Sequence, residues 1–563
     1  MSTDKSKGKR TRAEPAKAHG RDVLYLVFIF LTGAITLAME LLASRVLTPY
    51  FGVSLFIWSG ILSITLIALA LGYYAGGRVT QTPREQRRFS LDFLFLLMPT
   101  ISGIAIAASC LLYPKIFYTL GSTNLVMGAY AACMLLIFSP LVAVSSMNPL
   151  LIAIQSEKRN RGGDSGSGLV FFVSTVGSVI GVSLTAFLFI PNVTNFNSLL
   201  ILGVTLSTIS LIGGLTSTGL GPGEKNRLLG ISAIGVAISL GLLSYSSSYL
   251  KKNEPIAFGN GRWTLEREYT SLFGNTKIVT IAPAAGTPEA ELIEKYGTLY
   301  YTDGITMNII DPNGRSLTPF TYALEFLANG LRPDAERALM LGLGAGIIPM
   351  QLAQRGVDVD VVEIDPSSIA AAEDYFGFDP TRVDVIQTDA RTYVRDCEDS
   401  YDVVLIDMSH GDGLPEYLLS REFFLDIRRC LTRDGIAVFN TFAATEHLDA
   451  YYHIVKTVQA VFPELLMYHD GFEDGKRAIS IYLAALQQPA DGNFEIPIET
   501  VPKGIAHTIE RVFAQTRPLD ASLLAQAEIL EDEFNRFSFL NLKSDQFFRE
   551  SVLLTLPREF LVN

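Results

Sequence analysis

Three alternate glycines, Gly342, Gly344 and Gly346, lie where a strand predicted at 339–341 meets a helix predicted at 347–355. Glycine lets the backbone turn tightly and approach a ligand, and the first turn of a helix offers unpaired N–H donors. Glycines at such a junction also serve strand–helix packing alone. This glycine turn therefore indicates a ligand site only if further polar residues gather beside it.

Acidic residues follow the next three predicted strands. Glu363 and Asp365 end the second strand, Asp389 and Ala390 follow the third, and Asp407 ends the fourth. The carboxyl ends of parallel strands meet at one edge of an open α/β sheet, where ligands bind. An acid about 20 residues beyond the glycines accepts hydrogen bonds from ribose hydroxyls, and one after the third strand suits an adenine amino group. These residues and the glycine turn predict a pocket for an adenosine-containing ligand.

The glycine turn favours S-adenosylmethionine over a dinucleotide as that ligand. The G-x-G-x-G pattern lacks the third glycine of the dinucleotide fingerprint at its usual place. The Asp389-Ala390 pair suits an adenosyl sulfonium better than a pyrophosphate. The cofactor prediction is therefore of the S-adenosylmethionine type.

The order of predicted elements places these residues on an α/β fold. Residues 337–486 alternate short apolar runs with helical patterns, which is typical of a parallel sheet covered on both faces. Residues 262–315 alternate like strands and contain a turn signal at Asp303-Gly304. The predicted fold is a multi-pass helical membrane domain followed by a Rossmann-like transferase domain with a small β-hairpin subdomain. The predicted parts are a basic tail (1–21), a transmembrane bundle (22–252), the hairpin subdomain (253–330), the Rossmann-like domain (331–488) and a C-terminal helical extension (489–563).

The membrane prediction rests on composition. Hydrophobic residues make up 49% of the chain and charged residues 18%, below the roughly 25% of ordinary soluble proteins. Seven apolar runs approach the roughly 20 residues that a membrane helix needs. They are 22–47, 54–76, 91–113, 125–154, 168–190, 198–218 and 228–250. Glu40 and Arg45 lie in or at the end of the first run, where they are either satisfied structurally or part of a polar site.

Charge is distributed unevenly along the chain. Residues 1–21 carry a net charge of +5, residues 22–252 of +6 and residues 253–563 of −23. The acidic half disfavours nucleic acid and is compatible with a small cationic substrate. Basic residues gather in the tail and in alternate linkers at 77–90, 155–167 and 219–227, here called the basic linkers, which predicts a cytoplasmic N-terminus. Seven crossings would place the acidic half outside, whereas a cytosolic cofactor supply favours the inside; a miscount within 125–154 would reconcile the two.

The four cysteines are Cys110, Cys133, Cys397 and Cys430, and no two form a C-x-x-C pair. This spacing predicts no zinc or redox motif and no disulfide framework. It favours a reducing compartment for the acidic half.

The segment from about Tyr296 to Ala485 resembles the spermidine synthase (polyamine aminopropyltransferase) family. The matching pieces are Tyr301-Thr302-Asp303-Gly304, Pro319-Phe320-Thr321-Tyr322, the glycine turn, Glu363-Ile364-Asp365, Asp389-Ala390 and Tyr401-Asp402-Val403-Val404-Leu405-Ile406-Asp407. The helical half, with Met39-Glu40-Leu41 and the Gly72–Arg78 run, is similar to bacterial membrane-fused members, which implies a multi-pass protein of the inner membrane.

The resemblance implies transfer of an aminopropyl group from decarboxylated S-adenosylmethionine to an amine such as putrescine, without a metal. Glu363 would hold the ribose, Asp389 the adenine, and Tyr322 and Asp407 the amine. The implied partners are the lipid bilayer, the amine and a second copy in a homodimer.

The amine-binding half of the family pattern is altered here. The family's glycine turn usually carries Asp where this chain has Ala345, and Thr318-Pro319 replaces the usual acidic pair before Tyr322. The loop after Asp407 carries His410 at the position of the usual proton acceptor, with Asp412 two residues beyond. His410 and Asp412 form a replacement base, serve another acceptor or reaction, or mark a loop that only binds ligand.

Three functions therefore stay open at this stage. The first is an aminopropyltransferase with Asp407, His410 and Asp412 as catalytic residues. The second is a methyltransferase or another enzyme that consumes S-adenosylmethionine. The third is a membrane transporter or sensor whose soluble domain only binds an adenosyl ligand.

Overall fold

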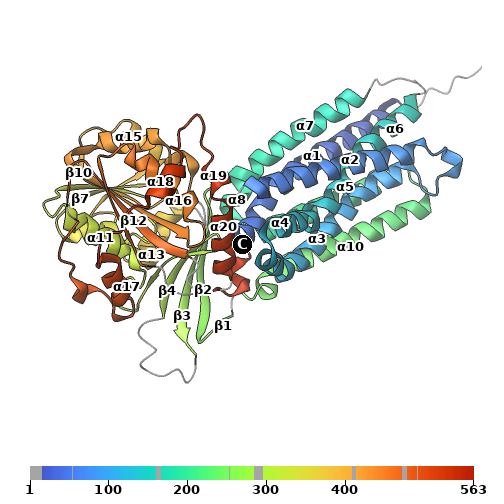
Figure 1. Cartoon of the computed structure of the whole chain (residues 1–563). Helices are drawn as coiled ribbons and strands as arrows, with labels where there is room; N and C mark the ends of the chain where they lie inside the picture. The colour runs from blue at the N-terminus through green and yellow to red at the C-terminus, as the bar shows by residue number, and fades with distance from the viewer. Residues whose placement is uncertain are drawn as a thin grey trace, which may run out of the picture.

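The computed structural model describes residues 15–53, 55–159, 166–252, 254–284, 296–408, 414–471, 478–490, 492–553 and 555–563. Figure 1 shows a helical bundle joined end to end with an α/β part, with α20 (Leu542–Leu553) between them. This arrangement gives the chain the helical half and the α/β half that the sequence predicts.

Within the described residues, seven helices are long and apolar enough to cross a membrane. The bundle elements are α1 (Pro15–Phe51), α2 (Leu55–Gln81), α3 (Leu91–Thr123), α4 (Leu125–Cys133), α5 (Ser139–Ser145), α6 (Met147–Arg159), α7 (Ser167–Leu184), α8 (Ile190–Asn192), α9 (Asn195–Thr216) and α10 (Pro222–Tyr249). The run that made the count uncertain forms a single candidate span, Leu125–Glu157. The number of candidate spans among the described residues is therefore seven, as the sequence predicts.

Small residues let the first and fifth spans touch along their backbones. A Cβ atom built on Gly177 would lie 2.1 Å from the carbonyl oxygen of Phe30, and one on Gly181 would lie 2.4 Å from Cα of Ala34. In lipid, helix association depends on such close packing because apolar side chains gain nothing by leaving the bilayer. The bundle is therefore held by backbone approach between α1 and α7, which lie side by side in Figure 1.

The described residues of the α/β part include two sheets. A five-stranded antiparallel sheet follows chain order and contains β1 (Ile256–Phe258), β2 (Gly261–Thr270), β3 (Asn275–Pro283), β4 (Gly297–Thr302) and β5 (Ile305–Ile310). The turn between β4 and β5 uses Asp303 at φ 47° and Gly304 at φ 93°. Aspartate and glycine tolerate this left-handed backbone, which explains the sequence signal for a hairpin.

The second sheet has seven strands in the order β11-β12-β10-β9-β6-β7-β8. Its strands are β6 (Arg337–Leu341), β7 (Asp358–Glu363), β8 (Asp384–Gln387), β9 (Tyr401–Ile406), β10 (Leu431–Ala444), β11 (Glu464–His469) and β12 (Ala478–Leu486). The predicted apolar runs all form strands, whereas β11 had no prediction. β6 to β10 pair in parallel, and β12 lies antiparallel between β10 and β11.

Helices cover both faces of this sheet. Side chains of α11 (Pro319–Leu331), α12 (Ile347–Gln354) and α17 (Lys503–Phe513) pack in the core of one face. Side chains of α14 (Ala390–Arg395), α15 (Arg421–Cys430) and α16 (Leu448–Gln459) pack in the core of the other. The remaining elements are α13 (Pro366–Tyr375), α18 (Ala521–Gln526) and α19 (Phe537–Leu540). Apolar residues on both faces explain why these strands appear as continuous apolar runs.

The last residues of the chain lie between the bundle and the five-stranded sheet. The backbone N–H of Phe196 in α9 donates to the carbonyl of Asn563 at 2.9 Å. The buried ammonium of Lys277 in β3 donates to the carbonyls of Phe560 at 2.7 Å and Val562 at 2.5 Å. Burial lowers the pKa of Lys277 to about 8, while Glu268 opposes the shift. These contacts bind three separate segments of the chain into one interface.

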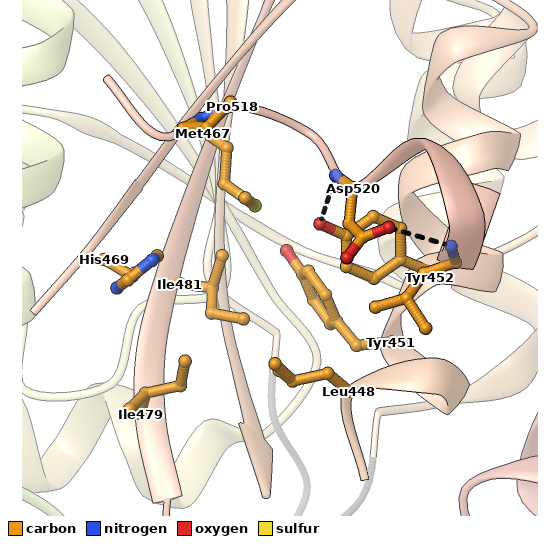
Figure 2. A pocket seen from close by; sticks show the side chains of 10 residues that line it. Leu448, Tyr451, Tyr452, Met467, His469, Ile479, Ile481, Pro518 and Asp520 are labelled. Atoms are coloured by element: carbon orange, nitrogen blue, oxygen red, sulfur yellow. Dashed lines mark hydrogen bonds between the residues drawn. The ribbon is translucent and has the colours of Figure 1, made fainter. Parts of the chain in front are cut away.

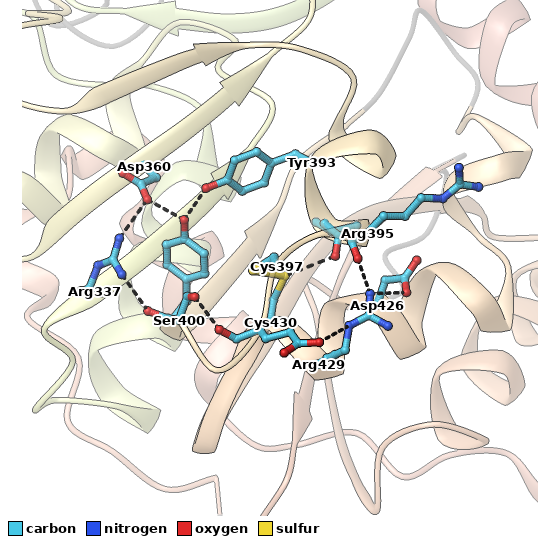
Figure 3. Close-up of a disulfide and its surroundings, with 12 residues drawn as sticks. Arg337, Asp360, Tyr393, Arg395, Cys397, Ser400, Asp426, Arg429 and Cys430 are labelled. Atoms are coloured by element: carbon cyan, nitrogen blue, oxygen red, sulfur yellow. Dashed lines mark hydrogen bonds and ion pairs between the residues drawn. A yellow bond between two sulfur atoms is a disulfide. The ribbon is translucent and has the colours of Figure 1, made fainter.

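A disulfide joins Cys397 and Cys430, with Cα atoms 4.9 Å apart (Figure 3). Cys430 ends α15, and Cys397 lies between α14 and β9. The backbone N–H of Ser400 donates to the carbonyl of Cys430 at 2.9 Å, which holds the two segments together. The prediction of no disulfide framework is therefore wrong. A pair separated by 33 residues leaves no local spacing signal and depends on the packing of α14 against α15.

Candidate active site

The glycine turn between β6 and α12 adopts backbone angles that favour glycine. Gly342, Gly344 and Gly346 have φ values of 91°, 55° and 72°. A Cβ atom on Gly342 would lie only 2.3 Å from the carbonyl oxygen of Asp407. The turn thus fixes the end of β6 directly against the end of β9, which pairs with it in parallel.

Glu363 ends β7 beside the glycine turn. One carboxylate oxygen accepts from the backbone N–H of Leu343 at 2.9 Å, and the other accepts from that of Asp365 at 2.7 Å. Burial raises the pKa of Glu363, and these backbone hydrogen bonds oppose the shift. A carboxylate has about four acceptor positions, and backbone N–H groups of Leu343, Ile364 and Asp365 occupy three of them, so this geometry leaves a position for a ribose hydroxyl.

Asp365 lies two residues beyond Glu363 and caps α13. Its carboxylate accepts from the backbone N–H of Ser367 at 2.8 Å and from the hydroxyl of Ser271. Burial raises the pKa of Asp365, and its hydrogen bond from the backbone of Ser367 opposes the shift. The structure thus joins Asp365 to the turn between β2 and β3, in addition to the glycine turn.

Asp389 caps α14 at the end of the next strand. Its carboxylate accepts from the backbone N–H of Thr392 at 2.9 Å, and Ala390 is buried behind it. The hydroxyl of Tyr417 donates to the other carboxylate oxygen at 3.1 Å. Burial and the charge of Asp389 raise the pKa of Tyr417 to about 12. Tyr417 lies in a short 3-10 helix after β9, and no spacing in the sequence signals its contact with Asp389.

Asp407 follows β9 at the carboxyl edge of the sheet. Its backbone N–H donates to the carbonyl of Leu341 at 3.0 Å, and its side chain accepts from the amide of Asn440 at 2.8 Å. Burial raises the pKa of Asp407 to about 6, and the hydrogen bond from Asn440 opposes the shift. A carboxylate with this pKa is ionised at neutral pH and is a competent proton acceptor. The sequence analysis missed Asn440 because it lies within β10, although the preceding residue, Phe439, pairs with Ile406 at the end of β9.

The other three residues predicted at the amine end have different outcomes. His410 and Asp412 lie outside the described residues, so their catalytic roles stay predictions. The hydroxyl of Tyr322 donates to the carbonyl of Ser316 at 3.1 Å, and its ring packs against Phe326. Burial raises the pKa of Tyr322 to about 12. The structure places Tyr322 at the start of α11, and its role toward an amine also stays a prediction.

A cavity of about 210 Å³ lies between the sheet and α16 (Figure 2). Tyr451 and Ile481 line it, and Thr441, which pairs with Ile481, bonds to the hydroxyl of Tyr451. Successive side chains of a strand point to opposite faces, so Asn440 and its partner Asp407 belong to the other face. The cavity is therefore separate from the predicted site.

The comparisons with known proteins point to one family. A family model described as the spermine/spermidine synthase domain matches residues 300–469. The polyamine aminopropyltransferase of Vibrio vulnificus is 32% identical over 249 residues, which cover 41% of this chain and 78% of that protein. Polyamine aminopropyltransferase 1 of Aquifex aeolicus is 25% identical over 263 residues, which cover 44% and 85%.

Among solved structures, spermidine synthase from Thermotoga maritima is 19% identical with a TM-score of 0.32, and the match covers 49% of this chain and 88% of that one. The relative from Vibrio vulnificus is matched over most of its own length. The range of the family model contains the glycine turn and the acids. The chain belongs to the polyamine aminopropyltransferase family, and it is an aminopropyltransferase.

Proposed function

We propose that this enzyme transfers an aminopropyl group from decarboxylated S-adenosylmethionine to a small cationic amine such as putrescine. The observation that carries the proposal is the shared sheet edge of Glu363, which is buried, and Asp407, which is partly buried; the glycine turn lies between them. Glu363 supports the nucleoside end, and Asp407 supports the reacting end.

The reaction needs positioning and one proton acceptor. The amine nitrogen attacks the carbon next to the sulfonium, a new C–N bond forms, and the C–S bond breaks with its electron pair going to sulfur. Methylthioadenosine leaves as a neutral product. Asp407 accepts the proton that the attacking amine must lose, because a protonated amine has no free electron pair. Its amide partner Asn440 keeps the carboxylate in place.

An assay with the detergent-purified full chain tests this proposal. Incubation with decarboxylated S-adenosylmethionine and putrescine is expected to release methylthioadenosine and spermidine in equal amounts, measured by mass spectrometry. Release of S-adenosylhomocysteine from S-adenosylmethionine would support a methyltransferase instead. Binding of methylthioadenosine without turnover of any amine would leave only a ligand-binding domain and would overturn the proposal. Light scattering of the same sample tests the homodimer that the family resemblance implies.

We also propose an orientation for the bundle in a bacterial inner membrane. Arg87 donates to Glu157 at 2.7 Å, and the backbone of Ser90 donates to Glu224 at 2.7 Å, so the basic linkers meet at one end of the bundle. In Figure 1 this end lies away from the α/β part. Basic linkers stay in the cytoplasm, which supports a cytoplasmic N-terminus and an α/β part on the opposite side. The pairing of Cys397 with Cys430 agrees with an oxidising compartment.

Thiol labelling of intact spheroplasts tests the orientation. Thr381→Cys introduces an exposed thiol in the α/β part, and Gln86→Cys introduces one in the first basic linker. A membrane-impermeant maleimide is expected to label the first variant and to spare the second until the membrane is opened. The reverse pattern would place the α/β part in the cytoplasm, beside the cellular source of the sulfonium donor.

A further inference from the structure

Arg45 connects the membrane bundle with the α/β part. It lies near the end of α1, and its guanidinium donates to the carbonyl of Leu272 in the turn between β2 and β3. The same guanidinium interacts electrostatically with Asp303 and Asp365. A charged residue at the end of an apolar helix thus lies near buried acids of the α/β part.

The turn that Arg45 contacts is held by the bundle at a second point. The hydroxyl of Thr270 donates to the carbonyl of Pro191 in α8 at 3.2 Å. Within the turn, the backbone N–H of Ser271 donates to the carbonyl of Gly274 at 3.0 Å, and the Ser271 hydroxyl oxygen accepts from the backbone of Phe273 at 3.0 Å. Because two bundle elements hold the turn, its position depends on the bundle.

Ser271 connects the turn between β2 and β3 with the nucleoside end of the site. Its hydroxyl, which donates to the carbonyl of Gly274 at 3.4 Å, is also within hydrogen-bonding reach of the Asp365 carboxylate. The backbone N–H of Asp365 donates to Glu363 at 2.7 Å. Glu363 in turn accepts from Leu343 in the glycine turn at 2.9 Å. An unbroken series of contacts therefore runs from α1 to the carboxylate predicted to hold the ribose.

The charges along this series require a cation. Asp303, Asp365 and Glu363 are buried acids, and like charges repel strongly at low dielectric. The guanidinium of Arg45 lies within electrostatic reach of two of them. Arg549 also approaches this group, donating to the backbone carbonyl of Asp303 at 3.2 Å. Removal of the Arg45 charge would favour displacement or protonation of the Asp365 carboxylate. Displacement would also move the backbone N–H of Asp365, from which Glu363 accepts.

We propose that Arg45 of the membrane bundle is a positioning residue for the nucleoside end of the active site, acting through the Ser271 turn and Asp365 on Glu363. The inference rests on the proposed adenosyl pocket. According to this inference, the bundle contributes to affinity for the sulfonium donor, because a residue of α1 helps to position the carboxylate of Glu363. The series ends at Leu343 of the glycine turn, and Asp407 makes none of its contacts.

Methylthioadenosine binding to the full chain in nanodiscs, measured by calorimetry, tests the proposal. Arg45→Met is expected to weaken binding by about tenfold and to raise KM for the donor similarly, with kcat changed by less than about threefold. Arg45→Lys keeps the charge and is expected to restore most of the affinity. A purely structural role would lower the folded fraction or kcat without this KM-against-kcat split.

The matched control is Lys115→Met, which removes a charge at the same end of the bundle. Lys115 lies over the ring of Tyr249, 5.8 Å from its centroid, and its loss is expected to leave methylthioadenosine binding unchanged. Ser271→Ala keeps Arg45 and is expected to weaken binding by about threefold. Combined with Arg45→Met it should add little, because both changes interrupt one series of contacts. Ser271→Ala also tests the proposal if Arg45→Met does not fold.

Glu363→Gln distinguishes a failure of the positioning role from a failure of the adenosyl pocket. If Glu363→Gln weakens methylthioadenosine binding while Arg45→Met and Ser271→Ala leave it unchanged, the proposed positioning role is wrong and the pocket stands. If none of the three variants changes binding, the adenosyl pocket itself is wrong. Additive effects of Arg45→Met and Ser271→Ala would overturn the shared route through the turn.

Discussion

Asp407→Asn is expected to lower kcat for aminopropyl transfer by about 10²–10⁴-fold, because the amide cannot accept the proton from the attacking amine. Affinity for methylthioadenosine should change by less than about threefold, since the glycine turn and Glu363 hold the nucleoside. Asn is close in shape to Asp and keeps an acceptor for the side chain of Asn440. Steady-state kinetics and calorimetry on the same preparation check both expectations.

The control for this change is Asp384→Asn, which replaces an exposed carboxylate at the start of β8. It alters charge by the same amount at the opposite edge of the sheet and should leave kcat unchanged. If Asp407→Asn had the same kcat as the control, Asp407 would not be the proton acceptor. The loop that contains His410 would then have to supply the group that accepts the proton.

The pH dependence follows from the same carboxylate. Because the pKa of Asp407 is about 6, its ionised form is lost as pH falls through that value. The rate of the wild type should therefore drop below pH 6 by about tenfold per pH unit. In Asp407→Asn this limb should be absent from the residual activity. A wild-type rate that stays level down to pH 5 would contradict the assigned base.

The raised pKa also predicts a change in stability. A buried acid whose pKa is raised favours the protonated form in the folded state, so ionisation destabilises the fold as pH rises from about 4 to 6. At pH 7, Asp407→Asn should raise the free energy of unfolding by about 1–2 kcal/mol, and the gain should vanish near pH 4. Activity and stability then change in opposite directions, as expected for an active-site charge.

The predicted parts of the site are those encoded by strand ends. Gly342, Glu363, Asp389 and Asp407 each follow an apolar run, and the rule that parallel strands end at one edge brings them together. The helices of the bundle could also be predicted from the sequence, because a helix that crosses a membrane needs a minimum length of apolar residues. Local sequence pattern and the length of apolar runs were thus enough to predict the fold class and to place these residues at one edge of the sheet.

The parts that the sequence did not predict depend on contacts between distant segments. Cys397 and Cys430 come together because α14 packs against α15 on one face of the sheet. Tyr417 contacts Asp389 from a short 3-10 helix. Arg45 was recognised as an unusual charge in an apolar run, but its contact with Leu272 joins residues 227 positions apart. Such contacts leave no periodicity in the sequence.

Gly342→Ala is expected to reduce turnover by about 10²-fold or more and to destabilise the protein. The added Cβ would lie 2.3 Å from the carbonyl of Asp407, so the end of β6 or of β9 must shift. The backbone angle of 91° adds a cost of about 1–2 kcal/mol for any residue with a side chain. Displacement of about 1 Å at a reacting group costs roughly 10²-fold in rate. Kinetics with thermal unfolding of the purified variant checks both effects.

Gly356→Ala separates the backbone cost from the steric one. Gly356 follows α12 with a φ of 88°, and a Cβ atom built there meets nothing within 4 Å. This variant should lose the same 1–2 kcal/mol or so of stability and retain its kcat, because it does not approach Asp407. If Gly342→Ala lost no more activity than Gly356→Ala, the glycine turn would not position Asp407. The link between the nucleoside end and the proton acceptor would then fail.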